Sequence, residues 1–308
     1  MNMTTVLGRF AICAVCVAFA ILPIASAQTY TQVDYPGAIA TELDGGPNLE
    51  GTSVGNWIDS SGVSHGFWVN AKGKFTTFDP PGSTSTTPNF INVNGVIVGS
   101  YLDSSSVSHG FILDQGKYTT VDAPGAAGTV LSGANNQGEL SGSTCTDPAC
   151  GSTGNASTDQ SFVRSGNGKY IFFNPPGATT SETSTVSVTG AVVGDYTDSS
   201  GNDYGYLHSQ GTYTTINFPA AVLTFALGGN VRNQIVGVYF DASFNEHGFL
   251  LDKGSYKSFD FPGATFTAAT GVNAFDVVVG VFGDASGNEH GFIRTPQGPE
   301  AQVTGESR

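Results

Sequence analysis

Four histidines occur in one repeated motif, and a repeated histidine is the first residue type to examine for metal or proton chemistry. Four imidazoles that converge on a symmetric scaffold would suit a transition metal. Two further copies of the motif carry Gln160 and Tyr204 at this position, so the shared property is a large side chain with a polar tip. We therefore expect the histidines to pack in the core, with metal ligation as the alternative, and His208, outside the motif, to lie on the surface. The motif is His-Gly-Phe, at residues 65–67, 109–111, 247–249 and 290–292.

Acidic loops form a second group of residues with potential chemistry. Each loop precedes the aromatic motif and combines Asp with Ser, Gly or Asn, which bond to their own backbone or permit chain reversal in tight turns. Hairpin turns are the simplest interpretation. The alternative is a surface for a cation or a polyhydroxy ligand, with Asp241, Glu246, Asp284 and Glu289 as candidate binding residues. The loops begin at Asp59, Asp103, Asp198, Asp241 and Asp284.

One acidic segment is dense enough in oxygen atoms to suggest a calcium site. Asp195, Asp198, Asn202 and Asp203 offer the hard oxygen ligands that Ca²⁺ prefers. Their spacing differs from that of an EF-hand loop. Calcium is therefore a candidate cofactor, and the sequence requires none.

The segment 143–159 breaks the repeat and is the best single position for a functional loop. It adds eight residues between a Gly and the following aromatic residue, and loops on a rigid scaffold often carry binding residues. Asp147 is its acidic candidate, and a tolerated insertion is the alternative. Cys145 and Cys150 flank Asp147, and in an exported chain we expect them to form a disulfide.

The segment Gly51-Thr52-Ser53-Val54-Gly55 matches the nucleophile elbow of serine hydrolases. That motif needs a strand, a strained turn and then a helix, and no helical pattern follows here, so we interpret the match as chance. The sequence also has no P-loop, dinucleotide fingerprint or HExxH motif. These observations favour a protein without catalytic activity, although residues far apart in the sequence can also form a catalytic site.

Composition and charge restrict the fold class and the partners. The 308 residues include 42 Gly, and Ser, Thr, Gly and Asn separate short runs of Val, Ile, Phe and Tyr, which is typical of many short strands. Only 12% of the residues are charged, and Asp plus Glu outnumber Lys plus Arg by 25 to 11. Nucleic acids and anionic membranes require clustered basic residues, which the sequence lacks. We expect an all-β protein that binds neither.

Residues 1–27 have the features of a secretory signal peptide. Arg9 precedes an apolar run over residues 10–24, and Ala25-Ser26-Ala27 provides a cleavage site. The run is short for a membrane span, so an uncleaved anchor is the less favoured alternative. No later segment is apolar enough to span a bilayer. We expect a secreted or periplasmic protein with no membrane insertion after signal removal.

The elements that position these residues follow from an internal repeat. Three motifs each occur six times: branched apolar residues before a Gly, the aromatic motif, and an Asp or Asn followed two residues later by Pro. The period of about 43 residues fits four short strands and four connections, which is the size of a propeller blade. The acidic loops and the Asp-x-Pro turns should then share one face of the molecule.

The two ends of the chain complete one repeat. Residues 30–37 form the strand that elsewhere follows the His-Gly-Phe strand, and the last repeat ends at Ile293 without it. Pairing of the two ends closes the ring and leaves no long sheet edge unpaired. We therefore predict a six-bladed β-propeller over residues 28–295, with 296–308 as a flexible tail. An open β-solenoid is the alternative.

The innermost strand of each blade borders the central channel. We place these strands near 84–92, 126–135, 178–188, 221–230 and 264–273, where Glu182 is the only charged residue. A charged catalytic channel is therefore not expected.

The repeats resemble those of the HAF family of extracellular repeat proteins, which carry a Val-Val-Gly step followed by His-Ala-Phe. Here the middle residue is Gly, and two of the six repeats have Gln-Ser-Phe from Gln160 and Tyr-Gly-Tyr from Tyr204 instead. The resemblance covers nearly all of the chain after residue 27. It implies an extracellular protein, and because the family has no agreed activity, it implies no reaction, cofactor or partner.

Three functions are consistent with this sequence. The leading hypothesis is a non-catalytic propeller that binds carbohydrate or protein at the cell surface through the acidic loops and the insertion. The first alternative is an exported polysaccharide hydrolase or lyase that uses carboxylates such as Asp198 and Asp203. The second is a structural protein of the envelope or matrix, suggested by the abundance of Gly, Ser and Thr.

Overall fold

The computed structural model of the chain describes residues 28–150 and 160–296. All regular secondary structure in these ranges is β-strand, in six antiparallel sheets of four strands each. A search of the same ranges finds no helix that could cross a membrane. The predicted signal peptide (1–27), residues 297–308 of the predicted tail and residues 151–159 of the insertion lie outside the described residues.

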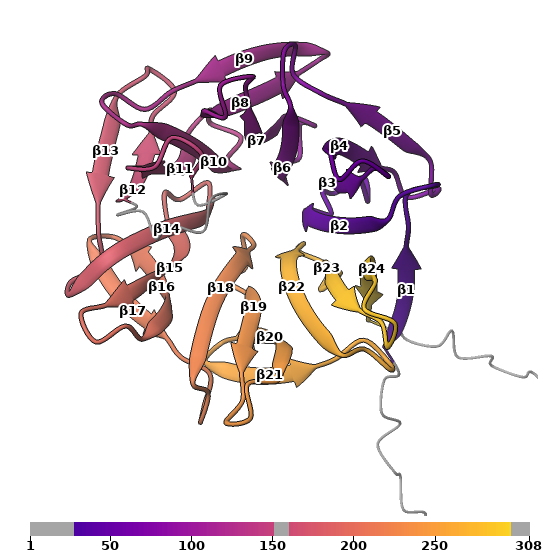
Figure 1. Cartoon of the computed structure of the whole chain (residues 1–308). Helices are drawn as coiled ribbons and strands as arrows, with labels where there is room; N and C mark the ends of the chain where they lie inside the picture. The colour runs from indigo at the N-terminus through magenta and orange to yellow at the C-terminus, as the bar shows by residue number, and fades with distance from the viewer. Residues whose placement is uncertain (1–27, 151–159, 297–308) are drawn as a thin grey trace, which may run out of the picture.

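The six sheets surround a central axis as the blades of a propeller, which confirms the predicted fold (Figure 1). In the first five blades the strands follow the chain from the axis outward. Blades 1 and 2 contain β2 (Ala40–Gly45), β3 (Ser53–Ile58), β4 (Ser64–Val69), β5 (Phe75–Phe78), β6 (Ser85–Ile91), β7 (Ile97–Leu102), β8 (Ser108–Asp114) and β9 (Lys117–Val121). Blades 3 to 5 contain β10 (Gly128–Ala134), β11 (Leu140–Cys145), β12 (Gln160–Arg164), β13 (Tyr170–Phe173), β14 (Ala178–Val186), β15 (Val192–Asp198), β16 (Asp203–Ser209), β17 (Thr212–Ile216), β18 (Leu223–Gly229), β19 (Ile235–Phe240), β20 (Glu246–Asp252) and β21 (Ser255–Phe259).

Blade 6 is built from both ends of the described chain. From the axis outward it consists of β22 (Phe266–Val272), β23 (Val278–Gly283), β24 (Glu289–Thr295) and β1 (Thr29–Val33). Strand β1 pairs antiparallel with β24, from Thr29 opposite Thr295 to Val33 opposite Gly291. Figure 1 shows β1 at the outer edge of this blade. The prediction that the N-terminal strand completes the last blade is confirmed.

A cross-strand pair explains the spacing between the two hydrophobic motifs. The Gly that ends each Val-Val-Gly step lies opposite the aromatic residue of the next strand, as Gly237 lies opposite Phe249. A Cβ at Gly237 would collide with the backbone carbonyl of Phe225 on β18 and with the Phe249 ring. Glycine therefore leaves room for a large ring in the core of each blade. The six buried rings are Phe67, Phe111, Phe162, Tyr206, Phe249 and Phe292.

The Gly inside the His-Gly-Phe motif brings neighbouring blades together. A Cβ at Gly110 would press on the Leu131 side chain of blade 3, and a Cβ at Gly291 would press on Leu43 of blade 1. At these positions the middle Gly faces the neighbouring blade and lets the two sheets approach.

A β-bulge near the end of every innermost strand links the blades around the channel. In each blade the register shifts at the same position, for example between Pro88 and Phe90. A bulge redirects a side chain, and three redirected side chains donate to a carbonyl of the next blade. These bonds run from Asn89 Nδ2 to Leu131 O (2.8 Å), from Ser184 Oγ to Ala226 O (2.7 Å) and from Thr270 Oγ1 to Leu43 O (2.6 Å).

The two ends of the ring carry different turns. At one end, which we call the aspartate face, the loops between the second and third strands of each blade lie with the turns that connect one blade to the next, as predicted. At the other end, the asparagine face, the loops between the first and second strands are built on Asn, or on Ser187 in blade 4. The candidate sites on these two faces are chemically distinct.

Candidate functional site

Each histidine of the repeated motif lies on the aspartate face between two carboxylates. His65 Nδ1 is 2.8 Å from Asp79 Oδ2, and His65 Nε2 is 3.7 Å from Asp59 Oδ2. The four histidine side chains are 17–26% exposed, so the prediction that they pack in the core is wrong. They stand near the beginning of the third strand, at the rim of the blade, where carboxylates reach both ring nitrogens. The other trios are Asp103–His109–Asp122, Asp241–His247–Asp260 and Asp284–His290–Asp34.

An Asp-x-Pro turn connects two blades through these histidines. Asp34 binds His290 of blade 6, whereas the next residue, Tyr35, stacks on Trp57 of blade 1 with ring centroids 4.4 Å apart. Trp57 in turn stacks on His65, with centroids 4.7 Å apart. The repeated histidine therefore has a structural partner on three sides. Similar stacks are Phe218–Tyr239–His247 and Phe261–Phe282–His290.

His208 also differs from its expected position on the surface. It is half-buried, and its ring stacks on Tyr213 with centroids 4.3 Å apart. Burial lowers the pKa of His208 below its ordinary value. This histidine is therefore part of the outer packing of blade 4.

The acidic loops are hairpin turns, as the simpler interpretation predicted. Asp241 Oδ1 accepts hydrogen bonds from the backbone N–H groups of Ser243 (2.7 Å) and Asn245 (2.9 Å), and its Oδ2 accepts one from the Asn245 side chain (2.9 Å). The Asn245 amide and then its backbone N–H hold the pKa of Asp241 at about 2, and Asn288 likewise lowers the pKa of Asp284. The candidate binding residues Asp241 and Asp284 are therefore engaged in their own turns.

The carboxylates around His290 make its contribution to stability depend on pH. Burial disfavours the charged imidazole, but hydrogen bonds to Asp34 and Asp284, together with their charges, raise the pKa of His290 above 6.5. A histidine whose pKa is raised by folding increases the free energy of unfolding. This contribution is fully present below the unfolded-state pKa and is lost as the pH rises through the folded-state pKa. Asp34→Asn should therefore lower the melting temperature more at about pH 5.5 than at about pH 8.5. Thermal unfolding followed by circular dichroism measures this, and equal losses at both pH values would contradict it.

The four candidate calcium ligands form two pairs. Asp198 and Asn202 close one hairpin, with Asn202 Nδ2 3.1 Å from Asp198 Oδ2. Asp195 is half-buried, and desolvation followed by the charge of Asp203 raises its pKa to about 7. The described residues contain no group of three or more His, Cys, Asp or Glu side chains arranged to hold a metal ion. Calcium binding at these residues stays a prediction.

The first innermost strand carries two acids in addition to Glu182, the only charged residue on the predicted inner strands. Glu42 and Asp44 lie on β2, which the predicted inner strands omitted. Burial, helped by Glu289, raises the pKa of Glu42 to about 7, and burial also raises the pKa of Asp44 beside it. The Asn56 amide nitrogen, in the orientation that satisfies its neighbours, lies 2.7 Å from Asp44 Oδ2 and 3.2 Å from Glu42 Oε2. Aligning the first repeat on its Gly would have placed both acids beside the channel.

The candidate binding residues Glu246 and Glu289 belong with these channel acids. They begin β20 and β24, next to the hairpin turns. Burial raises the pKa of Glu246, with a further contribution from the charge of Glu289, and Glu289 hydrogen-bonds to Glu42. Glu289 of blade 6 therefore interacts with Glu246 of blade 5 and with Glu42 of blade 1.

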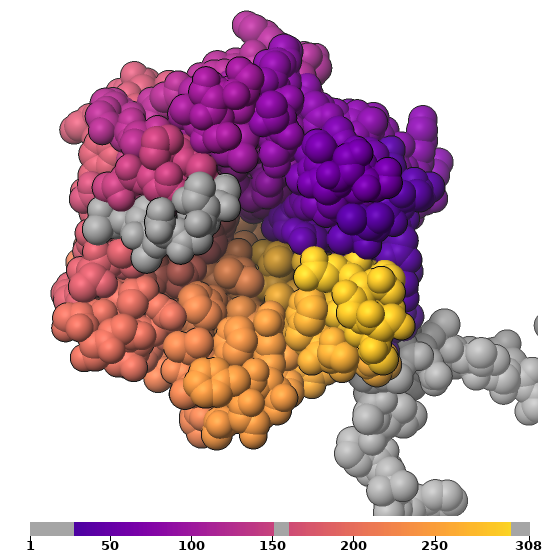
Figure 2. All heavy atoms as spheres, viewed as in Figure 1, coloured from indigo at the N-terminus to yellow at the C-terminus, as the bar shows by residue number. Residues whose placement is uncertain are grey.

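A pocket opens at the axis on the asparagine face, and all six blades line it. Its volume is about 140 Å³, and its walls include the buried side chains of Ile91, Val193 and Val272. None of the lining residues, all within the described ranges, is charged, although the chain has a net charge of −14. Figure 2 views the ring from the opposite, aspartate face and shows a hollow at its centre. Such a pocket suits an uncharged, apolar group.

The asparagine turns around this pocket are held by their own side chains. Asn230 Oδ1 accepts hydrogen bonds from the N–H groups of Arg232 (2.9 Å) and Gln234 (3.1 Å), and its Nδ2 donates to Asn273 O of the next blade (2.8 Å). The amides therefore fix the turns and connect the blades, which leaves ligand contacts to the residues at the turn tips. Matching bonds run from Asn48 to Asn92 O, from Asn92 to Asn135 O and from Asn135 to Ser187 O.

Apolar side chains project from the tips of these turns. In four blades the residue directly after the turn Asn or Ser is aliphatic and 36–64% exposed, and Phe275 is exposed in the Asn273 turn of blade 6. Exposed apolar side chains gathered on rigid turns mark an interaction surface. We call the four aliphatic residues the axial rim. Its members are Leu49, Val93, Val188 and Val231. The sequence signal was an aliphatic residue directly after the same turn position in each of these repeats, and it was missed because only polar residues were considered as binding candidates.

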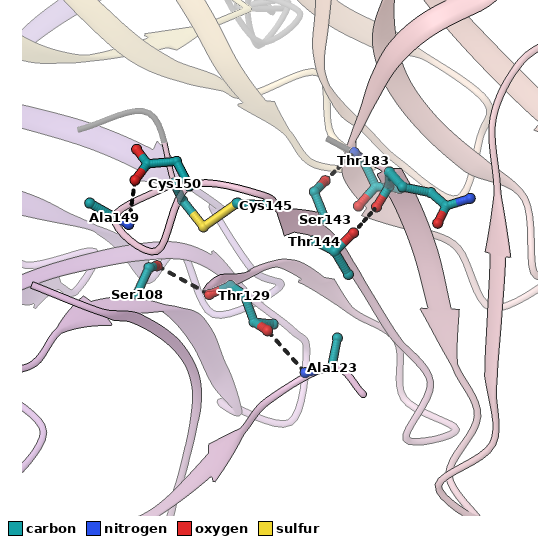
Figure 3. The surroundings of a disulfide bond; sticks show 11 residues. Ser108, Ala123, Thr129, Ser143, Thr144, Cys145, Ala149, Cys150 and Thr183 are labelled. Atoms are coloured by element: carbon teal, nitrogen blue, oxygen red, sulfur yellow. Dashed lines mark hydrogen bonds between the residues drawn. A yellow bond between two sulfur atoms is a disulfide. The ribbon is translucent and has the colours of Figure 1, made fainter. Parts of the chain in front are cut away.

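The described part of the insertion is a short disulfide loop, as predicted. Cys145 and Cys150 are joined with an S–S distance of 2.09 Å. Asp147 accepts a hydrogen bond from the Ala149 N–H at Oδ1 (3.3 Å), and its carbonyl accepts one from the Cys150 N–H (3.0 Å). Pro148 O accepts a further bond from the Ser108 N–H of blade 2 (2.7 Å). Figure 3 shows the loop around this disulfide. Asp147 thus helps to shape the loop.

Comparison with known proteins identifies the fold and no family. No family model matches the chain, and no curated protein matches its sequence. A solved structure of putative TolB from Agrobacterium tumefaciens superimposes with a TM-score of 0.55 at 13% identity, over 83% of this chain and 88% of that chain. A mutant of AofleA from Arthrobotrys oligospora gives a TM-score of 0.53 at 13% identity over 86% of both chains. The fucose-specific lectin from Aleuria aurantia gives 0.50 at 11% identity over 88% of this chain and 100% of that chain. At these identities the similarity shows the propeller fold alone.

Proposed function

We propose that this chain is an exported, non-catalytic binding protein that holds a cell-surface partner, protein or glycan, on its asparagine face. The uncharged axial pocket surrounded by the axial rim carries the proposal. Exposed aliphatic side chains on rigid turns are unfavourable in water, and a partner that covers them removes that cost. The apolar lining implies that the partner inserts an uncharged, apolar group into the pocket.

The binding surface in this proposal differs from the acidic loops that the sequence favoured. The carboxylates of Asp241 and Asp284 hold hairpins, and the repeated histidines hold blades together. Groups with these structural tasks are poorly placed to act as acids, bases or nucleophiles. This distribution of polar groups favours binding over catalysis.

An exported location is supported by two observations. The Cys145–Cys150 disulfide is typical of oxidising compartments outside the cytoplasm. Residues 1–27 have the sequence features of a secretory signal. The resemblance to the HAF repeats agrees with the same location.

Binding of a neutral apolar fluorophore tests the proposed face. We expect N-phenyl-1-naphthylamine to bind the mature protein with a rise in fluorescence, because one of its aromatic groups can enter the uncharged pocket while the other contacts the axial rim. Val231→Asp places a charge on the axial rim and should weaken binding at least about tenfold. The control is Val222→Asp, since Val222 is also an exposed valine, at 42% against 64% for Val231, but lies on the aspartate face.

Two results would contradict the proposal. One is equal loss of fluorophore binding in Val231→Asp and Val222→Asp, which would mean general hydrophobic adsorption. The other is a screen of glycans and envelope proteins in which every ligand found is lost on mutating the aspartate face and retained in Val231→Asp.

A further inference from the structure

Blade 3 lacks the aromatic stack that fills one position in the other blades. In blade 1 this position on the aspartate face holds Trp57 stacked on His65. The equivalent residues of blade 3 are Thr144 and Gln160, and the preceding Asp-x-Pro turn contributes Ala123 in place of an aromatic ring or a Pro. All three side chains are non-aromatic, so the position that is filled elsewhere is open here.

A cleft of about 620 Å³ occupies this position. Its walls include Thr144 and Gln160, the turn 124–127 and Phe172 on β13. No charged residue of the described chain lines it. The Cys145–Cys150 disulfide fixes the end of β11 directly after Thr144, as Figure 3 shows, so this wall is held in place before a ligand arrives. The volume lies in the range of small-molecule sites.

Phe172 provides a preoriented aromatic surface in the cleft. Its side chain is 38% exposed although phenylalanine is usually buried. The ring lies parallel to Tyr170, with centroids 5.8 Å apart and an interplanar angle of 10°, and meets Phe162 edge-on at 6.0 Å. Tyr170 is fixed in turn by a hydrogen bond from its hydroxyl to Asp122 O (3.3 Å). The exposed ring therefore needs no reorganisation to receive an apolar face.

Hydrogen-bonding groups surround this ring. Thr144 Oγ1 donates to Gln160 O (3.4 Å), which leaves the Thr144 oxygen able to accept a bond. The exposed Gln160 amide makes no side-chain hydrogen bond within the described residues, so both its donors and its acceptor are available to a ligand. A purely apolar ligand would leave these groups unpaired on burial. The ligand should therefore combine an apolar face with several hydroxyl groups.

We propose that the blade 3 cleft binds a neutral saccharide, with the C–H face of one sugar ring on Phe172 and its hydroxyls on Thr144 and Gln160. The absence of a charged lining residue in the described chain favours a neutral sugar over a uronate or an amino sugar cation. The site lies on the opposite face from the axial pocket. The saccharide proposal is therefore independent of the proposed function, and each can be tested without the other.

Saturation-transfer NMR with defined neutral sugars tests the saccharide site. The probes are the methyl glycosides of glucose, galactose, mannose, fucose and N-acetylglucosamine, with glucuronate as the charged comparison. At least one neutral glycoside should receive saturation from the mature protein. Phe172→Ala should weaken its affinity at least about tenfold, and Thr144→Tyr should abolish binding by refilling the cleft. Phe244→Ala, which removes an exposed ring elsewhere on the same face, is the matched control.

The outcomes separate this site from the axial pocket. Retained sugar binding in Val231→Asp, together with loss in Phe172→Ala and Thr144→Tyr, supports the proposal. Thermal unfolding of each variant shows whether it is folded. If Thr144→Tyr does not fold, Phe172→Ala alone tests the site. No binding of any neutral glycoside, preferential binding of glucuronate, or equal binding in Phe172→Ala and the wild type would overturn the proposal.

Discussion

A chain that begins at Asp34 should lose folding stability on the order of 5 kcal/mol, because it lacks the outer strand of blade 6. Strand β1 contributes the buried Val33 and the ring of Tyr30, which packs on Phe261 and Phe292 with centroids 5.6 Å and 6.4 Å apart. Its removal also exposes the edge of β24 that it covers. Thermal unfolding by calorimetry of the truncated and the mature chains measures the loss.

Addition in trans of a peptide spanning residues 28–37 distinguishes ring closure from a general effect of truncation. The peptide supplies the β1 pairing that the truncated chain lacks, so it should restore most of the lost melting temperature in a concentration-dependent way. The same peptide with Tyr30 and Val33 replaced by Ser is the control. An unchanged melting temperature after truncation would mean that β1 does not close the ring.

Glu42→Gln should stabilise the protein by up to about 3 kcal/mol at about pH 8 and have little effect at about pH 4. Burial and Glu289 raise the pKa of Glu42 from 4.5 to about 7. The folded state therefore binds this proton more tightly than the unfolded state. The contribution of protonated Glu42 to the free energy of unfolding is fully present below the unfolded-state pKa. It falls as the pH rises from about 4.5 to about 7 and stays reduced above that range. Glutamine keeps the oxygen that faces Asn56 and removes the charge.

Urea unfolding of wild type and variants over this pH range measures the effect. Because Glu42 and Glu289 interact, the double variant Glu42→Gln/Glu289→Gln should gain less than the sum of the two single variants. Asp44→Asn should also stabilise the protein at alkaline pH, since burial raises the pKa of Asp44 and Asn supplies an N–H donor, as Asn89 does in blade 2. A wild-type stability that does not fall between about pH 4.5 and pH 7 would contradict the buried position of these acids.

Local sequence patterns were sufficient to predict the fold. The Val-Val-Gly and His-Gly-Phe steps fix a cross-strand pair, as in Gly237 opposite Phe249, and each repeat carries one such pair. Closure of the ring could be predicted because the chain begins, at residues 30–37, with the strand that the last repeat lacks. Both features are visible in short stretches of sequence. Alternation along a strand indicates which face of the sheet a residue occupies, but not how near the rim it lies. That is why His65 and its equivalents were placed in the core although they lie among carboxylates.

The candidate site was less accessible to sequence reasoning. Leu49, Val93, Val188 and Val231 come from turns one repeat or more apart, and only ring closure brings them around one axis. The blade 3 cleft likewise arises because Thr144 and Gln160 stand where other repeats carry two stacked rings, such as Trp57 and His65. The disulfide was predicted because its two cysteines are close in sequence. Glu42 and Asp44 were missed because the inner strand of the first repeat was not aligned with the others.

The most direct test of the account is a crystal structure of the mature protein with N-phenyl-1-naphthylamine bound. In the proposed function the main binding surface is the uncharged axial pocket on the asparagine face and not the acidic loops. We expect one aromatic group of the fluorophore inside the pocket, against Ile91, Val193 and Val272, and the remainder of the molecule against the axial rim. A fluorophore bound on the aspartate face, with ordered water filling the axial pocket, would contradict the account.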